Sequence, residues 1–323
     1  MIELILFPWK NIGCDRLLVK VLQSLILGEK VEMTNKQPHI SIGLPVYNGE
    51  KFITEAIESI LAQTFEDYEL IISDNHSTDR TEEICRQYAA KNPSIRYYRQ
   101  NQNRGAAWNF NHVFQLARGE YFKWAAADDV CEPNFLARCT EVLDRDPSVV
   151  LAYPKTIFTK ADGQKWWEGK SVQKLGSEQV HERFRAVIAD FWCLEVFGLM
   201  RKEALKKSSL IASYYGSDKL LLAQLSLLGR FEEIPEPLFF RRCHAEQSSR
   251  LSPQEREMWI DPQNAGQSKS LGNISSLRYF SAVWQAQLDW QDRTRCFLSL
   301  IDYLFAAKTW KKFFHKKAPT KVY

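Results

Sequence analysis

Short apolar runs alternate with segments of helical periodicity over the first half of the chain, from residue 39 onward. The apolar runs have the length and the β-branched and aromatic content of strands, and they cover residues 39–46, 68–73, 95–99, 121–127 and 149–153. Between them, apolar residues recur every three to four positions, as in amphipathic helices, over residues 49–64, 80–91, 106–117 and 133–144. This alternation, with short connections, predicts an α/β fold in which helices cover both faces of a mainly parallel sheet.

Polar clusters follow three of these predicted strands. They are Pro45-Val46-Tyr47-Asn48, Asp74-Asn75 and Asp128-Asp129. Ligands of open parallel sheets bind at the carboxyl ends of the strands, near the point where the strand order reverses. We therefore expect the three clusters to meet in one crevice.

The second half of the chain is less regular. Helices are predicted at 177–192, 217–228, 276–290 and 292–315, and a strand at 196–200. Residues 232–241 are predicted to be extended, and Pro235 and Pro237 favour an edge position because proline cannot donate to a strand ladder. We divide the chain into an N-terminal extension (1–37), an α/β domain (38–250) and a C-terminal helical region with a basic, aromatic tail (251–323).

The positive charge of the chain is concentrated in that tail. The net charge is +4, yet the tail holds six lysines and no acid (Lys308, Lys311, Lys312, Lys316, Lys317 and Lys321), which leaves the body slightly negative. A nucleic-acid-binding body would need a basic face, so nucleic acid is not an expected partner. Lysines interleaved with Trp310, Phe313 and Phe314 would suit an anionic membrane surface, and a solvated helix end that packs its aromatic residues on the body fits equally well.

The sequence favours a reducing, cytoplasmic location, with peripheral contact at the inner face of a membrane as an option. The seven cysteines are dispersed and none has C-x-x-C spacing, which argues against a disulfide framework or a zinc knuckle. Residues 1–27 lack the apolar core and cleavage site of a signal peptide. No stretch approaches the ~18–20 apolar residues that span a bilayer.

Four polar features could support chemistry, although each also has a structural explanation. Asp128 and Asp129 offer hard oxygen ligands for Mg²⁺ or Mn²⁺ held together with substrate phosphates, or they form a turn. Asp74 could bind a base or ribose, or again form a turn. Asp218, at the start of a helix, could act as a general base or interact with the helix dipole. Arg241 and His244 could bind a diphosphate and its metal, or belong to a surface basic patch.

The order of these features resembles glycosyltransferase family 2, the large inverting group with the GT-A fold. The resemblance covers about residues 38–250, in the stretches LPVYNGEKFITEAIESILAQTFEDYELIISDNHSTDRTEEICRQYA, NRGAAWNFNHVFQLARGEYFKWAAADDVCEPNFL and GSDKLLLAQLSLLGRFEEIPEPLFFRRCH. It implies a nucleotide-sugar donor, UDP-linked by preference, a divalent cation (Mn²⁺ or Mg²⁺), and a glycan or lipid-linked acceptor in cell-surface polysaccharide or glycolipid synthesis.

The resemblance also implies roles for individual residues. Pro45, Tyr47 and Asn48 match the turn that borders the nucleotide base, and Asp74 matches the acid that contacts uracil or its ribose. A glycine-containing segment near the donor corresponds to Asn103, Gly105 and Asn111. The D-x-D region that handles ribose and metal–diphosphate corresponds to Asp128 and Asp129, the catalytic base to Asp218, and a residue that closes over the phosphates to His244.

Two departures from the family pattern keep another function open. Ala126 stands where many relatives have the first acid of D-x-D-D, and Ser217-Asp218 replaces the usual Glu-Asp pair. Ala126 supports the alternative that the chain is a non-catalytic nucleotide- or glycan-binding protein with the same fold. A nucleotidyltransferase is disfavoured because PVYNGEKF, after the first strand, lacks a glycine-rich basic loop. Trp166, Trp167 and Trp192 could stack on sugar rings or pack within the protein.

Overall fold

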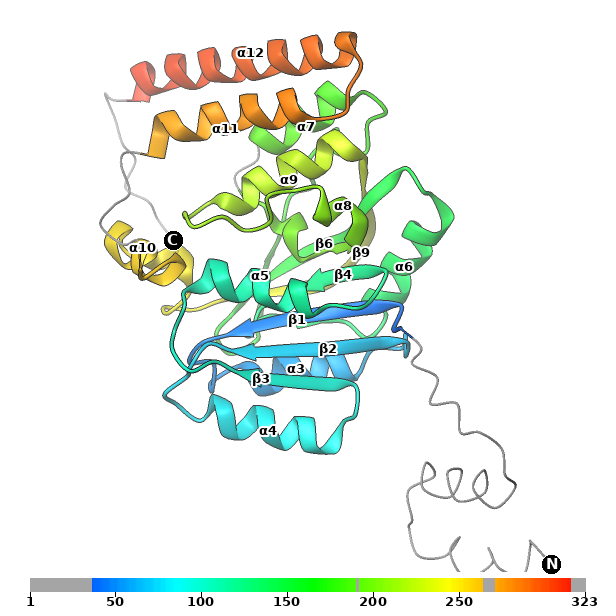
Figure 1. Ribbon diagram of the computed structural model, residues 1–323, viewed down its shortest axis with the longest axis vertical. Coiled ribbons are helices and arrows are strands. Elements are labelled where there is room, and N and C mark those ends of the chain that lie inside the picture. Colours follow the sequence, from blue (N-terminus) through cyan, green and yellow to red (C-terminus); the bar gives the residue numbers. More distant parts are fainter. Residues whose placement is uncertain (1–36, 190–191, 264–270, 315–323) are drawn as a thin grey trace, which may run out of the picture. The chain divides into compact units, whose positions relative to one another are not determined.

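The computed structural model describes residues 37–189, 192–263 and 271–314, and the predicted alternation of strands and helices is present in its first half. Figure 1 shows the elements in chain order. They are β1 (Ile40–Val46), α3 (Ile53–Leu61), β2 (Tyr68–Asp74), α4 (Thr81–Lys91), β3 (Ile95–Arg99), α5 (Ala106–Leu116), β4 (Tyr121–Trp124), β5 (Val130–Cys131) and α6 (Phe135–Arg145). Apart from Gln37, the predicted N-terminal extension lies outside the described residues.

The second half adds longer strands and more helices. In chain order these are β6 (Val149–Lys160), β7 (Lys165–Glu168), α7 (Val180–Ala189), the 3₁₀ turn η1 (Leu194–Phe197), β8 (Leu199–Arg201), α8 (Lys202–Lys206), α9 (Ser217–Leu228), β9 (Arg230–Cys243), η2 (Ser248–Arg250), α10 (Pro253–Ile260), α11 (Leu271–Gln285) and α12 (Trp290–Phe314). The prediction of a strand at 196–200 is wrong for its first residues, because Leu194–Phe197 form the 3₁₀ turn and the strand β8 begins at Leu199.

All strands belong to one mixed sheet with the order β3-β2-β1-β4-β8-β6-β9-β5, and β7 pairs with β6. Strands β1 to β4 are parallel, as predicted, and β8 then runs antiparallel to both β4 and β6. Strand β9 is not a simple edge segment, since it pairs with β6 along its length and with β5 at Phe239 and Phe240. Its prolines fall where the β6–β9 register shifts, which is a position that tolerates proline.

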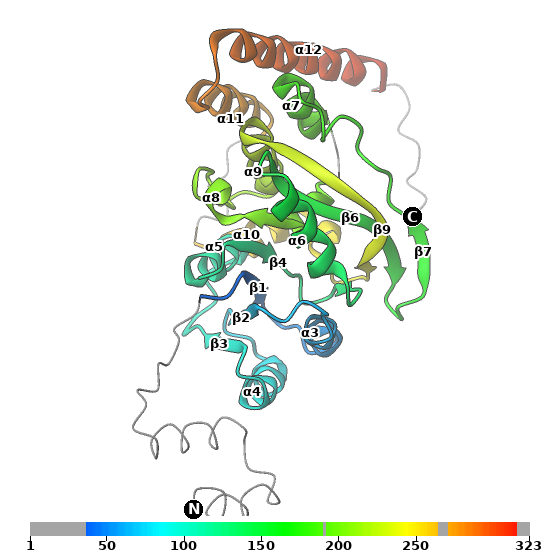
Figure 2. The same cartoon turned by 90° about the vertical axis from the view of Figure 1, so that its right-hand side faces the viewer.

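Helices cover both faces of the sheet, and each face has its own hydrophobic core. Figure 2 shows the sheet with α3, α4 and α6 on one side and α5, α7 and α9 on the other. The alternation of side chains along β2 places Leu70 and Ile72 in one core and Ile71 in the other. At Gly43 a Cβ atom would lie 2.6 Å from Val113 Cγ2, so glycine at this position allows α5 to pack closely on β1.

The C-terminal helices extend the second core. Helix α12 packs against α7 and α11, and α11 packs against α9. Within the part of the chain that the structure describes, no helix is long and apolar enough to cross a bilayer. The side chains of the basic tail, 308–323, lie outside the described residues.

Candidate active site

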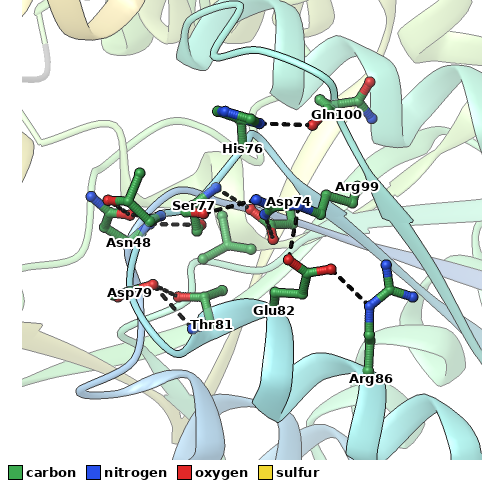
Figure 3. A network of polar contacts seen from close by, with 12 residues as sticks. Asn48, Asp74, His76, Ser77, Asp79, Thr81, Glu82, Arg86, Arg99 and Gln100 are labelled. Carbon is green, nitrogen blue, oxygen red and sulfur yellow. Dashed lines mark hydrogen bonds and ion pairs between the residues drawn. The ribbon is translucent and has the colours of Figure 1, made fainter.

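The carboxyl ends of β1, β2 and β3 lie in register, as the parallel pairing requires. Val46 is opposite Asp74, and Asp74 is opposite Arg99. After β1 the chain turns at Asn48, whose φ of 53° is left-handed. The Asn48 side chain accepts a hydrogen bond from the Thr78 backbone N–H (2.8 Å), and the Asn48 backbone N–H donates to Ser77 Oγ (2.9 Å); Figure 3 shows the resulting network. The turn therefore fixes the loop that follows β2.

Asp74 lies at the centre of this network and is fully buried. Its Oδ1 accepts a hydrogen bond from the Ser77 N–H (2.8 Å), and its Oδ2 accepts hydrogen bonds from the Tyr97 hydroxyl and Arg99 Nη1 (2.8 Å each). Arg99 also pairs with Glu82 on α4 (2.9 Å) (Figure 3). Both carboxylate oxygens thus hold β3 and the loop in place. Tyr47, in the turn after β1, has 44% of its surface exposed.

Asn103 and Gly105 shape the entry to α5. Asn103 Oδ1 accepts hydrogen bonds from Asn75 Nδ2 and from the Gly105 N–H (2.9 Å each). Gly105 has a φ of 85°, and a Cβ atom there would lie 2.6 Å from the Ile260 carbonyl oxygen, so the position requires glycine. The predicted segment is therefore built into the same edge of the sheet, next to α10.

The side chain of Asn111 is hydrogen-bonded to the backbone of another segment of the protein. Its Nδ2 donates to the Ile211 carbonyl (2.8 Å), and its Oδ1 accepts from the Ile211 N–H (3.1 Å). The Asn111 amide thus ties α5 to the loop that leads to α9, so any influence of this side chain on a donor would act through that loop.

The two aspartates after β4 have different environments. Asp128 is 31% exposed, and its Oδ2 lies 2.9 Å from His244 Nε2. Asp129 is buried, and its Oδ1 accepts a hydrogen bond from the Arg242 backbone N–H (2.9 Å). Burial and the neighbouring Asp128 carboxylate raise the pKa of Asp129 well above its ordinary value. Asp128 is therefore the aspartate that faces the edge of the sheet, together with a histidine from the end of β9.

Arg242 supports this arrangement, and its role was not predicted from the sequence. Its buried guanidinium donates to the carbonyls of Asp128 (Nε, 3.0 Å) and Ala161 (Nη1, 2.8 Å) and pairs with Glu55 on α3. The Phe52 ring contacts both the guanidinium (4.7 Å to the ring centroid) and the His244 ring (4.8 Å between centroids). The Arg241-Arg242 pair could have indicated this role. Side chains alternate along a strand, so two adjacent arginines point to opposite faces of the sheet and cannot both act on the same ligand.

Asp218 is the second residue of α9, which begins at Ser217 directly after Gly216, whose φ of 85° allows the tight entry to the helix. Its Oδ1 accepts a hydrogen bond from the Lys219 N–H (2.8 Å). Burial raises the pKa of Asp218, and the positive charge of Arg241 opposes that shift. Arg241 also opposes the rise in the pKa of Asp129. The charge of Arg241 thus lowers the pKa of a carboxylate at the start of α9 and of one in the segment after β4.

A divalent cation fits this site if a substrate supplies further oxygens. Among the residues that the structure describes, no group of three or more His, Cys, Asp or Glu side chains could hold a metal ion. Asp128 and His244 nevertheless present an oxygen and a nitrogen 2.9 Å apart. Mg²⁺ is often bound by one or two carboxylates together with substrate phosphates, so a complete protein cage is not needed.

Comparisons with known proteins agree with this architecture. The family model described as Glycosyl transferase family 2 matches residues 41–208, which is more than half of the chain. The chain is 30% identical over 247 residues to a chondroitin synthase from Escherichia coli, covering 74% of this chain and 34% of that protein. It is 27% identical to a hyaluronan synthase from Pasteurella multocida, covering 74% of this chain and 24% of that protein. The chain therefore spans about a third or less of the length of these two relatives.

Solved structures share the fold. TarS residues 1–349 from S. aureus, in complex with UDP, matches with a TM-score of 0.59 and 17% identity, covering 83% of this chain and 72% of that one. A mannosyltransferase, PcManGT from Pyrobaculum calidifontis, in complex with GDP-Man and Mn²⁺, matches with a TM-score of 0.52 and 16% identity, covering 88% and 89%. These neighbours confirm the predicted GT-A fold. From its matched domain and its fold, the chain belongs to glycosyl transferase family 2.

Proposed function

We propose that the chain transfers a sugar from a nucleoside-diphosphate sugar, UDP-linked by preference, to a hydroxyl group of a glycan acceptor, with inversion at the anomeric carbon. The observation that supports this most is the placement of Arg241, whose positive charge lowers the pKa of Asp218 and of Asp129, two carboxylates from separate parts of the chain. A base and a phosphate-binding edge are both needed for sugar transfer.

In this proposal Tyr47 stacks on the nucleotide base, while Pro45 and Asn48 shape the turn beneath it. Asp74 acts by fixing the loop after β2, because its oxygens are already bonded to Ser77, Tyr97 and Arg99. Asn103 and Gly105 position the start of α5 beside the donor.

Asp128 and His244 would hold a divalent cation, Mn²⁺ or Mg²⁺, against the diphosphate. Bound there, the cation would neutralise the charge that develops on the leaving diphosphate. Arg241 would add a second positive charge from β9. Asp129 positions this edge through its bond to the Arg242 N–H rather than by facing the ligand.

Asp218 would accept the proton of the acceptor hydroxyl. As the proton leaves, the hydroxyl oxygen forms a bond to the anomeric carbon from the side opposite the diphosphate, and the bond to the diphosphate oxygen breaks. A raised pKa suits this role, because a base works best with a pKa near the operating pH. A single displacement of this kind inverts the anomeric configuration.

The test is sugar release and transfer by purified protein, with UDP-sugars and GDP-mannose as donors and Mn²⁺ present. We expect a UDP-sugar to be consumed, EDTA to abolish the reaction, and the transferred sugar to have inverted configuration by NMR. A protein that binds UDP-sugar yet never releases or transfers the sugar would instead be the non-catalytic binder that Ala126 leaves open.

The acceptor and the cellular role are proposed from relatives and from exposed surface. Two relatives are named as synthases of chondroitin and hyaluronan, which supports a polysaccharide acceptor.

Exposed apolar residues on one side of α12 (Trp290, Leu298 and Phe305) support peripheral contact with an anionic membrane alongside the basic tail. Flotation with phosphatidylserine vesicles should weaken in the double variant Leu298→Glu/Phe305→Glu. Unchanged flotation of this variant and of a chain lacking 308–323 would contradict the membrane contact.

A further inference from the structure

We propose that three aromatic residues beside Arg241 form the acceptor subsite, and that a pyranose ring of a glycan chain stacks on the two of them that are exposed, Trp167 and Trp192. The residues are Phe158 on β6, Trp167 on β7 and Trp192 before η1, and together we call them the aromatic row. This inference rests on the proposed transferase function and names the part of the site that selects the acceptor.

Strand pairing places the aromatic row next to Arg241. Phe158 is opposite Trp167 on one neighbouring strand and opposite Arg241 on the other. Residues directly opposite each other in a sheet present their side chains to the same face. The Arg241 guanidinium lies 5.9 Å from the centre of the Phe158 ring, which agrees with that placement. Figure 2 shows β7, β6 and β9 side by side at this end of the sheet.

The rings form a compact unit. Phe158 and Trp167 are stacked, with centroids 3.9 Å apart and planes at 5°. Trp192 meets both rings edge-on, at 5.5 Å from Phe158 and 5.7 Å from Trp167. The stack holds Trp167 in one orientation, so its ring is already ordered before a ligand arrives. Such preorganisation reduces the entropy cost of binding.

The aromatic row leaves apolar surface open to solvent. Phe158 is buried, whereas Trp167 is partly exposed and Trp192 is 46% exposed. Clustered exposed aromatic residues mark ligand-binding grooves more often than isolated ones do. A sugar ring has an apolar C–H face that complements an aromatic face, and its hydroxyl groups remain available to polar partners.

The aromatic row lies next to elements that carry the proposed reaction centre. The Arg241 guanidinium lies over the Phe158 ring. The 3₁₀ turn η1, which begins two residues after Trp192, packs against α9, the helix that carries Asp218. A glycan that stacks on Trp167 and Trp192 would therefore lie near the start of α9, where Asp218 is the proposed base.

The same hairpin offers a matched control. Trp166 is next in the chain to Trp167 and 49% exposed, yet it has no ring contact with the described members of the row. The register of β6 and β7 shifts at this point, which sets Trp166 apart from the ladder. Trp166→Ala therefore removes an exposed tryptophan of the hairpin without touching the proposed subsite.

The experiment measures oligosaccharide binding by calorimetry in the wild type and in Trp192→Ala, Trp167→Ala, Trp192→Phe and Trp166→Ala. The probes are hexasaccharides of chondroitin, hyaluronan and cellulose, and UDP with Mn²⁺ is titrated separately as a check of fold and donor site. We expect Trp192→Ala and Trp167→Ala to weaken binding of a hexasaccharide about 2- to 10-fold each, the range typical of aromatic stacking. Trp192→Phe should recover part of the loss, and Trp166→Ala should bind as the wild type does.

The outcomes separate this inference from the proposed function. Equal hexasaccharide binding by wild type, Trp192→Ala and Trp167→Ala, or binding of UDP but of none of the three hexasaccharides by the wild type, overturns the acceptor subsite. Failure of the wild type to bind UDP or to consume any nucleotide sugar overturns the proposed function instead. In transfer assays the variants should raise KM for the acceptor and leave donor hydrolysis unchanged, a split that a general loss of stability would not produce.

Discussion

The edge of the sheet holds aspartates in two different settings. At the ends of β2 and β3, Asp74 is fully buried and both its oxygens are bonded to Ser77, Tyr97 and Arg99. At the ends of β4 and β9, Asp128 faces His244 and is partly exposed, and the carboxylate of Asp218 lies within reach of the charge of Arg241. An aspartate whose oxygens are already bonded maintains the structure, whereas one that keeps an open oxygen can act on a ligand.

Replacing Asp218 should give the largest effect on activity. Asp218→Asn keeps the size of the side chain and removes the proposed base, so kcat should fall about 10²- to 10⁴-fold, the contribution of general-base catalysis. Binding of UDP with Mn²⁺ should stay at the wild-type level. Asp162→Asn, in the exposed turn between β6 and β7, is the matched control. Transfer by Asp218→Asn at the wild-type rate would show that another group accepts the proton.

Replacing Asp74 should affect stability instead. Asp74→Ala removes the carboxylate that Tyr97 and Arg99 share, while Arg99 keeps Glu82 as a partner. It should cost about 3 kcal/mol of unfolding free energy, the lower end for breaking a buried ion pair, because Arg99 is 24% exposed and keeps that second partner. Urea unfolding of Asp74→Ala and Asp128→Ala measures the contrast. Equal stability of the two variants would contradict the distinction between a structural and a ligand-facing aspartate.

Replacing Asp128 or His244 should weaken the affinity for UDP that depends on Mn²⁺. Removal of a metal ligand should cost at least the roughly 10- to 100-fold typical for loss of an outer-shell partner. Calorimetry with and without EDTA separates this effect from direct binding of the nucleotide. If the affinity of the wild type for UDP does not depend on Mn²⁺, Asp128 and His244 do not hold a cation, and Arg241 alone would bind the diphosphate.

The pH dependence should show the smallest change. The base must be unprotonated, so kcat/KM should rise with pH through the pKa of Asp218, which burial places above the ordinary value for aspartate. Arg241→Gln removes a charge that lowers this pKa, so the rising limb should move to higher pH. The position of the limb is the readout, since Arg241 also contributes to binding. An unchanged limb would mean that Arg241 does not act on the base.

The elements of the first half could be predicted because each depends on a local pattern. The alternation of apolar residues located β1 to β4 and the helices between them, and the parallel order brought the three polar clusters to one edge. The contrast between Asp74 and Asp128 could not be predicted, because both follow an apolar run. What separates them is contact with residues distant in the sequence, Arg99 in one case and His244 in the other.

The region of the proposed acceptor subsite was the least predictable. The sequence indicated a strand only as far as residue 153, whereas β6 continues to Lys160 and pairs with β7. Pro154 and the shifts of the β6–β9 register on either side of Lys155 interrupt the regular alternation on which the prediction depended. The sequence offered Trp166, Trp167 and Trp192 alike as rings that could stack on sugars or pack within the protein. Only the packing on Phe158 shows that Trp167 and Trp192 form one unit.

Anomalous diffraction from crystals grown with Mn²⁺ and UDP tests most directly whether Asp128 binds the ligand while Asp74 maintains the structure. We predict a Mn²⁺ peak beside Asp128 Oδ2 and His244 Nε2, at about 2.0–2.2 Å from each as for oxygen and nitrogen ligands of similar divalent ions, with the diphosphate completing the coordination and Asp74 still bonded to Arg99. Mn²⁺ bound at Asp74, or UDP bound with its diphosphate away from Asp128 and His244, would contradict this assignment.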